Sequence, residues 1–420
     1  MKRYPLLKMS FTLSLVLIIG LCFIFTSSAF AAPKEVKVGL IYPVSGPLAS
    51  VGKRCVNGHE YAVKLINEQG GIKSMGGAKI KLIVADSEGK PEIGMSETEK
   101  LITRENVAVV MGAWQSAVTF PTTQVAEKYK TPYIVPLAVA DAITERGFKY
   151  TFRTGMTATI NANLAFDIIK WLGEKTGKKA KTVAILNEDS LWGDSTAKTW
   201  EKNAGNYGLK VVGKFMYNKA ATDLSPTITK MKSLKPDIVL QCAYTTDAIL
   251  ITKQMHEMDF NCMARIPSGG GYADPKFVKA AGKLGENLIV NMIFHPSAKG
   301  PGTKVQDTNA DYQKSYEGEM DEYVTTAFDA TWVLKDALER AASADRKKLR
   351  DAISKTNINT NNSPVLEAYD FKFNEKGQVP NPTGVAAQIQ NGKMLAIHPD
   401  NVAVTKPVYP VPTWKDRGLR

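Results

Sequence analysis

Residues 107–141 contain two short runs of apolar, mostly β-branched residues, at 107–111 and 133–135, with a helical pattern between them. Runs of this length and composition are typical of buried strands. We expect Pro121 in the first turn of the helix, where its missing N–H does no harm. A strand, a helix and a second strand in this order predict one βαβ unit of a parallel sheet.

Polar residues follow the first apolar run, at 114–116. Ligands of parallel sheets bind beyond the carboxyl ends of the strands, where such residues lie. Ser116 is expected at or near the start of the helix, with Thr119 close by. Their hydroxyls, the free backbone N–H groups and the helix dipole favour an anion such as a carboxylate. A serine that only caps the helix is the alternative interpretation of this segment.

The alternation of strands and helices occurs twice, over 36–135 and again over 160–266. It predicts an α/β fold with two doubly wound sheets, and 420 residues are enough for two hydrophobic cores. The extended piece 151–154 is expected to cross between the lobes. We expect lobe 1 to comprise 32–153 and 288–370, and lobe 2 to comprise 154–287 and 371–420 with a C-terminal arm.

The last part of the chain adds a long amphipathic helix, expected at 323–342, and a shorter one at 346–355. Residues 388–394 place Asn391 and Gly392 between two strand patterns, which predicts a β-hairpin with an Asn-Gly turn. The proline-rich tail from His398 is expected to pack as an extended arm.

The N-terminus has the pattern of a secretory signal peptide. Basic residues precede an apolar run at 13–25, and Ala29-Phe30-Ala31 is a small-x-small cleavage site. We expect residues 1–31 to be removed after Ala31, which would place the mature protein in the periplasm or outside the cell. The apolar run is short for a membrane span, and no later segment is long and apolar enough to cross a bilayer.

The chain is basic, with a formal net charge of +13, but its basic residues are spread along the sequence rather than clustered. We interpret them as solvated helix faces with some steering of anionic ligands, and expect no nucleic-acid partner. Without the signal peptide, Cys55, Cys242 and Cys262 remain. Parallel strands would place Cys242 and Cys262 at opposite ends of a sheet, so we expect buried free thiols.

Catalytic and metal-binding motifs are not found. The sequence has no Gly-x-Ser-x-Gly elbow and no His-Glu-x-x-His, and its four histidines, His59, His256, His295 and His398, are scattered. The glycines at 269–271 lack the spacing and acidic partner of a dinucleotide fingerprint. The sequence therefore favours binding without turnover, with no metal and no cofactor.

A set of short motifs in this order resembles the periplasmic branched-chain amino acid (Leu/Ile/Val)-binding proteins, the type I solute-binding components of ABC transporters. The motifs are Val44-Ser45-Gly46-Pro47, 66–72, 112–119, 132–140, 222–225, Lys235-Pro236-Asp237 and Phe328-Asp329-Ala330. The resemblance implies two Rossmann-like lobes joined by a three-stranded hinge, which close on a small ligand. It also implies a monomer that delivers this ligand to a membrane permease.

The resemblance further implies which residues bind the ligand. Trp114, Gln115 and Ser116 match the loop that holds a carboxylate through a serine hydroxyl and backbone N–H groups. Ala138, Val139 and Ala140 match a second loop, which in this chain carries no hydroxyl. Aromatic side chains of the wall are matched by Trp192, Tyr244 and Tyr323.

The chain departs from the family in the loop Ser268-Gly269-Gly270-Gly271-Tyr272, of which Gly270 and Tyr272 are expected to line the site. Amino-acid binders of the family present an acidic residue there, which pairs with the ligand ammonium. Either another acid, such as Asp189 or Asp247, replaces it, or the ligand has no ammonium group. The expected ligands are hydrophobic or branched-chain amino acids and aromatic or aliphatic carboxylates. The alternative function is a ligand-sensing module for amides, urea or organic acids.

Overall fold

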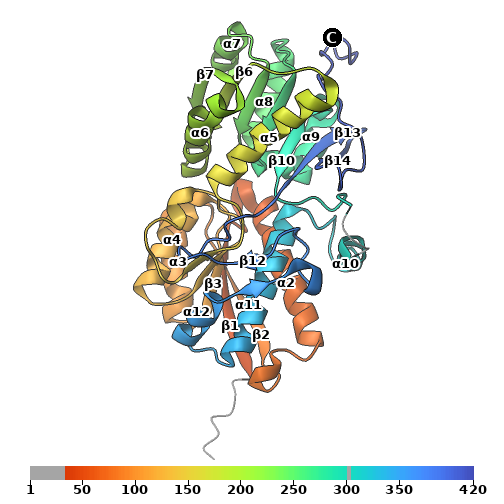
Figure 1. The fold of residues 1–420 in the computed structure, drawn as a ribbon. Coiled ribbons are helices and arrows are strands. Elements are labelled where there is room, and N and C mark those ends of the chain that lie inside the picture. Colours follow the sequence, from red (N-terminus) through yellow and green to blue (C-terminus); the bar gives the residue numbers. More distant parts are fainter. Residues whose placement is uncertain (1–33, 300–303) are drawn as a thin grey trace, which may run out of the picture.

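The computed structural model describes residues 34–299 and 304–420 (Figure 1). The expected signal peptide lies outside the described residues. Figure 1 shows two lobes, one above the other, with several chain segments running between them. No helix in the described part of the chain is both long and apolar enough to span a membrane.

The first lobe is built on a parallel five-stranded sheet in the order β2-β1-β3-β4-β5. Its strands are β1 (Glu35–Tyr42), β2 (Lys79–Asp86), β3 (Val109–Gly112), β4 (Tyr133–Val135) and β5 (Thr151–Arg153). Its helices are α2 (Ala49–Glu68), α3 (Pro91–Thr103), α4 (Ser116–Lys128), α11 (Glu322–Ala341) and α12 (Arg346–Ile353).

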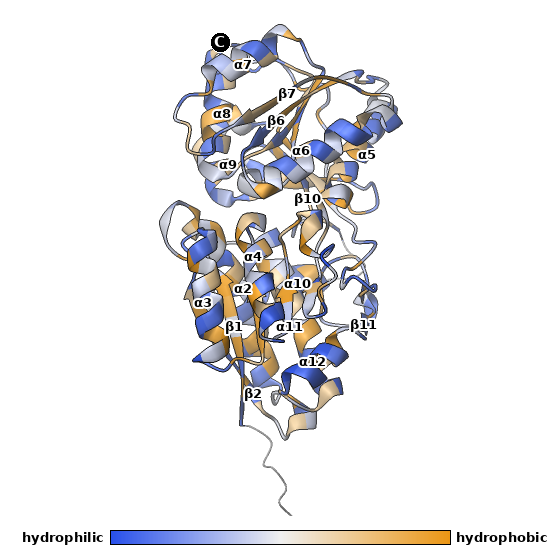
Figure 2. Ribbon diagram, turned by 90° about the vertical axis from the view of Figure 1, so that its left-hand side faces the viewer, coloured by the Kyte–Doolittle hydropathy of each residue, from blue (hydrophilic) through white to orange (hydrophobic). Residues whose placement is uncertain are grey.

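Helices cover both faces of this sheet, because successive strand residues point to opposite sides. Leu40 of β1 packs into the core that includes α2 and α11, whereas its neighbour Ile41 packs into the core beneath α3 and α4. Figure 2 shows the resulting pattern, with hydrophobic strands inside and hydrophilic residues on the outer helix surfaces.

The second lobe repeats the plan with a parallel sheet in the order β7-β6-β8-β9. Its strands are β6 (Thr182–Glu188), β7 (Lys210–Tyr217), β8 (Ile238–Cys242) and β9 (Ala264–Pro267). Its helices are α5 (Ala158–Thr176), α6 (Leu191–Asn203), α7 (Ser225–Ser233), α8 (Thr245–Glu257) and α9 (Pro275–Ala281).

Strand β10 (Ile289–Met292) extends the second lobe, because Asn291 bridges Ser268 in parallel just after β9. It pairs antiparallel with β13 (Val385–Gln390), which pairs with β14 (Lys393–His398). The predicted hairpin is confirmed, with Asn391 and Gly392 at φ of 53° and 73° in its turn. The remaining elements are α10 (Lys304–Tyr312), β11 (Asn357–Ile358) and β12 (Phe371–Lys372).

Two local predictions need correction. Pro121 lies inside α4 rather than in its first turn, because the helix begins at Ser116 with Gln115 as its N-cap. The sequence predicts a strand at 182–186 and a loop at 187–194, but the second segment is mostly regular structure. Strand β6 continues to Glu188 and α6 begins at Leu191, after Ser190 accepts a hydrogen bond from the Trp192 N–H.

The three cysteines are free; Cys55 and Cys242 are buried, whereas Cys262 is only partly buried. Cys242 ends β8 and Cys262 precedes β9. The C-terminal arm packs against the second lobe, where the Trp414 indole N–H donates to the Phe260 carbonyl at 2.9 Å.

The predicted fold class, two doubly wound lobes joined by a hinge, is confirmed. One connection leaves β5 for α5, a second leaves β10 for the first lobe, and a third joins β12 to β13 (Figure 1). The first and third run side by side, since the Arg153 N–H donates to Gly377 at 2.7 Å and the Val379 N–H donates to Arg153 at 3.2 Å. The residue numbers that we expect for the lobe boundaries stay a prediction.

Arg153 is fully buried at the point where the first connection leaves the lobe. Its guanidinium donates to the carbonyls of Ala138 at 3.0 Å and Ala140 at 2.8 Å, and to the Thr144 hydroxyl at 2.7 Å. It also donates to the Gln378 side-chain carbonyl on the third connection. One side chain therefore ties the loop after β4 to the hinge.

Replacing Arg153 with methionine, which keeps much of the side-chain volume, would leave these acceptors unsatisfied in the core. We expect the free energy of unfolding to fall by roughly 3–5 kcal/mol, because each neutral acceptor left buried without a donor costs about 1–3 kcal/mol. Urea unfolding followed by circular dichroism measures the change. Arg104→Met, at an exposed arginine that ends α3, is the control and should change stability little; an equal effect of both variants would contradict this role of Arg153.

Candidate functional site

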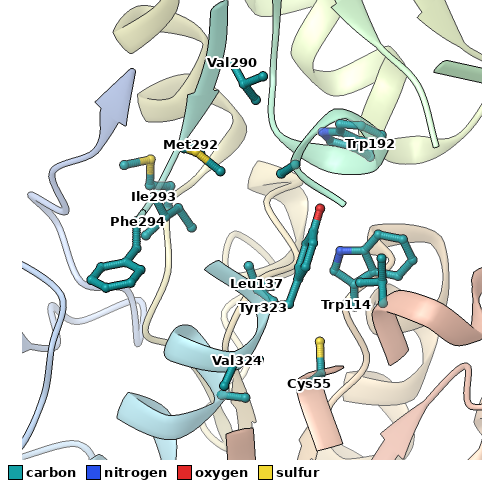
Figure 3. Close-up of a cluster of buried hydrophobic side chains, with 14 of the residues drawn as sticks. Cys55, Trp114, Leu137, Trp192, Val290, Met292, Ile293, Phe294, Tyr323 and Val324 are labelled. Carbon is teal, nitrogen blue, oxygen red and sulfur yellow. The ribbon is translucent and has the colours of Figure 1, made fainter. Parts of the chain in front are cut away.

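A cavity lies between the lobes, at the carboxyl ends of their parallel strands. Most of the residues proposed from the sequence line it, namely Trp114, Gln115, Ser116, Val139, Trp192, Tyr244, Gly270 and Tyr323. Figure 3 shows Trp114 and Tyr323 below Trp192, with Leu137 nearby. The cavity is therefore formed by loops and helix starts of both lobes.

Three proposed residues are not part of the cavity wall. The carbonyl groups of Ala138 and Ala140 bind Arg153, so they hold the loop rather than face the cavity. Tyr272 is fully buried in the second lobe, where its ring packs edge-on against Phe277 with the centroids 5.0 Å apart. The sequence placed them close to the site but could not give the direction in which each group points.

Ser116 is the first residue of α4 and is buried in the cavity wall. Its hydroxyl oxygen accepts the Ala140 N–H at 3.2 Å, which leaves the hydroxyl hydrogen available to a ligand. A helix leaves its first N–H groups without partners inside the helix, and the Gln115 side chain does not cap them. The alternative interpretation, in which Ser116 only caps the helix, does not hold, because Gln115 occupies the N-cap position.

Two neighbours of Ser116 shape this loop. The Thr119 hydroxyl accepts the Ala113 N–H at 3.1 Å and donates to the Gln115 carbonyl at 2.9 Å, so it fixes the loop instead of facing a ligand. Trp114 has a left-handed backbone with φ of 74°. Such a conformation is costly for a bulky residue, and strained residues of this kind cluster at functional sites.

Aromatic side chains of the two lobes meet across the cavity. The Trp114 ring lies 5.4 Å from Tyr244 and 6.0 Å from Tyr323, and Trp192 lies 5.3 Å from Tyr244, centroid to centroid. The Tyr323 hydroxyl of the first lobe donates to the Gly270 carbonyl of the second. These contacts describe a closed arrangement of the lobes.

The glycines after β9 are required by this arrangement. Gly269 and Gly270 have φ of 46° and 56°, which favours glycine. A Cβ on Gly270 would lie 2.2 Å from the Trp192 ring, and one on Gly269 would lie 2.9 Å from the Glu322 carboxyl oxygen Oε1. The loop therefore brings its backbone, not a side chain, to the cavity.

Sequence reasoning did not include several residues that line the cavity, namely Leu137, Asn161, Ser268, Gly269, Ile293 and Glu322. Asn161 and Ser268 bond to each other, and the Asn161 carbonyl accepts the Asn291 side chain at 2.7 Å. The only signal for Glu322 was its position next to Tyr323 at the start of an expected helix.

Glu322 is buried at the N-terminus of α11, where its Oε2 accepts the Ile293 N–H at 3.1 Å. Burial raises the pKa of Glu322 to about 8, against the lowering effect of that hydrogen bond. The two acids considered from the sequence do not reach the cavity. Asp189 is exposed and accepts the Lys219 N–H at 3.2 Å, and Asp247 is bonded to the Tyr217 hydroxyl inside the second lobe.

A family model described as periplasmic binding protein matches residues 35–393. The chain belongs to the periplasmic binding protein family. Among curated relatives, the Leu/Ile/Val-binding protein homolog 7 of Brucella abortus is 30% identical over 396 residues, which is 90% of this chain and 95% of the relative. The homolog 8 of Brucella suis is 30% identical over 391 residues, 91% of this chain and 95% of that one. The protein is thus a periplasmic binding protein of the Leu/Ile/Val-binding type.

Solved structures share the fold. A leucine-binding protein LivK from Thermotoga maritima superposes with a TM-score of 0.76 at 22% identity, covering 87% of this chain and all of that one. LivJ from Streptococcus pneumoniae, in complex with isoleucine, gives 0.75 at 23% identity, with coverages of 86% and 97%. A Rhodopseudomonas palustris solute-binding protein in complex with benzoate gives 0.75 at 21% identity, with coverages of 90% and 99%.

The periplasmic binding protein family consists of binding proteins, and this protein is accordingly not an enzyme. Within 34–299 and 304–420, no group of three or more His, Cys, Asp or Glu side chains could hold a metal ion. The buried His59 is used structurally, with the Tyr42 hydroxyl at 2.9 Å from Nε2 and the Thr331 hydroxyl at 2.7 Å from Nδ1.

The raised pKa of Glu322 makes stability depend on pH. Between its ordinary pKa of 4.5 and about 8, the folded protein holds a proton that the unfolded chain has lost. The free energy of unfolding should therefore fall as the pH rises through this window, by up to about 5 kcal/mol from this group. Glu322→Gln removes the effect, so its melting temperature should exceed that of the wild type more at pH 8.5 than at pH 5. A constant difference would contradict the prediction.

Gly270→Ala should disturb closure, because the added methyl group would overlap the Trp192 ring. Gly282→Ala is a matched control, since Gly282 has a similar φ of 50° but open space around its Cβ position. Both variants should lose roughly 1–3 kcal/mol to backbone strain, but only Gly270→Ala should also lose ligand affinity, by at least about tenfold. Calorimetric titration with the ligand that stabilises the wild type compares them, and equal affinities would contradict the role of Gly270.

Proposed function

We propose that the protein captures a small carboxylate-bearing ligand outside the cytoplasm and delivers it to the membrane permease of an ABC importer. The observation that carries the proposal is the start of α4 in the cavity wall, where Ser116 offers a hydroxyl beside uncapped backbone N–H groups. Such helix starts bind anions through their N–H groups and dipole. Hydrophobic amino acids and aromatic or aliphatic carboxylates are the ligand classes that suit the aromatic walls.

Closure would be the working step of the mechanism. The aromatic contacts of Trp114 with Tyr244, and the Tyr323 bond to Gly270, join the two lobes directly over the cavity. Farther out, the Ser50 hydroxyl of α2 donates to Asp274 of the second lobe at 3.3 Å. A ligand held by both lobes would shift the open–closed equilibrium toward this state and raise the melting temperature by mass action.

Location and partners complete the proposal. The signal peptide expected at 1–31 would export the chain, with cleavage after Ala31. The mature protein would act as a monomer, with permease subunits as its partners and no nucleic acid. Radioactive-ligand uptake by cells that lack the gene, with and without a plasmid copy, tests the importer role; equal uptake of a ligand that the purified protein binds would contradict it.

The carboxylate site is tested by Ser116→Ala. Loss of a hydrogen bond to a charged group should weaken carboxylate ligands by roughly 1–3 kcal/mol. The protein is first unfolded and refolded to remove any bound ligand, and is then screened by thermal shift and titrated calorimetrically. The ligands are leucine, isoleucine, valine, phenylalanine, benzoate, cinnamate, short dicarboxylates and urea. Ser225→Ala, at the first residue of α7 in the second lobe, is the control and should bind like the wild type.

An unchanged affinity of Ser116→Ala would place the anion site elsewhere. A thermal shift with urea but with no carboxylate would contradict the proposed ligand class.

A further inference from the structure

Glu322 is the only acidic or basic residue among the described residues that line the cavity. Its backbone belongs to α11 of the first lobe, where Asp321 caps the helix by accepting the N–H groups of Tyr323 and Val324. The carboxylate of Asp321 is engaged by Arg54. Glu322, in contrast, has no basic side chain bonded to it among the described residues.

The two carboxyl oxygens of Glu322 are used differently. Oε2 accepts the Ile293 N–H at 3.1 Å, whereas Oε1 lies beside Gly269. The position that a Cβ on Gly269 would take is 2.9 Å from Oε1. A side chain at 269 and the carboxylate of Glu322 therefore compete for the same space, and glycine leaves that space to Glu322.

We propose that Glu322 binds the ammonium group of the ligand, which is therefore a free amino acid with an apolar side chain. The inference rests on the proposed function, because the carboxylate of this amino acid is placed at the start of α4. The glycine loop then lacks an acid because the acid comes from the opposite lobe, on α11. Both charged ends of the ligand are bound by the first lobe, and the second lobe adds Trp192 and Tyr244 around the side chain.

Electrostatics support this choice of ligand. A buried carboxylate without a cation is costly, and an ammonium group at hydrogen-bond distance compensates for it. A carboxylic acid without an amine offers no cation to Glu322, whose carboxyl group would then keep its proton. The aromatic faces of Trp114 and Tyr323, which also line the cavity, are favourable neighbours for a cation.

The test compares amino acids with their deaminated counterparts, which keep the carboxylate and the side chain. Refolded, ligand-free protein is titrated with leucine and 4-methylpentanoate, and with phenylalanine and 3-phenylpropanoate. The wild type should bind the amino acids more tightly. Glu322→Gln should weaken the amino acids by roughly 10- to 100-fold, the value of a hydrogen bond between charged groups, and leave the deaminated acids unchanged or tighter.

Two further variants keep the test decisive. Glu319→Gln, at an exposed acid just before α11, should bind every ligand like the wild type. Gly269→Ala should weaken the amino acids selectively, since its methyl group would displace the Glu322 carboxylate, whereas Gly282→Ala should not. A melting temperature of Glu322→Gln at or above that of the wild type shows that the variant folds.

The outcomes separate this inference from the proposed function. Tighter binding of the deaminated acids by the wild type, or an unchanged leucine affinity in Glu322→Gln, would overturn the role of Glu322. The carboxylate site would stand in that case, provided that Ser116→Ala still weakens the bound acids. Binding of neither class by the wild type would overturn both.

Discussion

The arrangement of the hinge and of the cavity loops depends on the hydrogen bonds of the buried Arg153 guanidinium. It sits where β5 ends and the chain leaves the first lobe, and it binds two carbonyls of the loop after β4 together with Gln378 on the third connection, between β12 and β13. That loop also donates its Ala140 N–H to Ser116, at the start of α4. The geometry at the start of α4, where we propose the anion site, and the geometry of the hinge are therefore set by one connected network of buried hydrogen bonds, and removal of any partner leaves a desolvated group.

Closure imposes a second constraint, which falls on the loop after β9. Trp114, Trp192, Tyr244 and Tyr323 fill the space between the lobes so closely that the loop can approach only as bare backbone. The carbonyl of Gly270 then becomes the acceptor for the Tyr323 hydroxyl. Glycine is thus selected by packing and by backbone conformation together, and the carboxyl group of Glu322 on α11 reaches the same place from the other lobe.

Much of this architecture could be predicted from the sequence, because buried parallel strands and amphipathic helices have distinct periodicities. The loops at the strand ends could also be predicted as the candidate site. Ser116 and four of the predicted aromatic residues, Trp114, Trp192, Tyr244 and Tyr323, line one cavity, whereas Tyr272 does not. The direction of each side chain within those loops could not be predicted. The Thr119 hydroxyl, for example, accepts the Ala113 N–H, because that buried N–H needs a partner nearby. Nor could Glu322 be found, since its access to the cavity depends on how the crossing segment with Ile293 packs against α11.

Which ligand binds depends on the side chains that reach the cavity rather than on the fold itself. Solved neighbours in complex with isoleucine and with benzoate superpose on this chain equally well, with TM-scores of 0.75 for both. The shared fold therefore accommodates ligands with and without an ammonium group. An acid fixed to the first lobe would let that lobe hold both polar ends of an amino acid before closure. The second lobe would then add only apolar contacts, so the pairing of charges and the burial of the side chain become separate steps of one binding event.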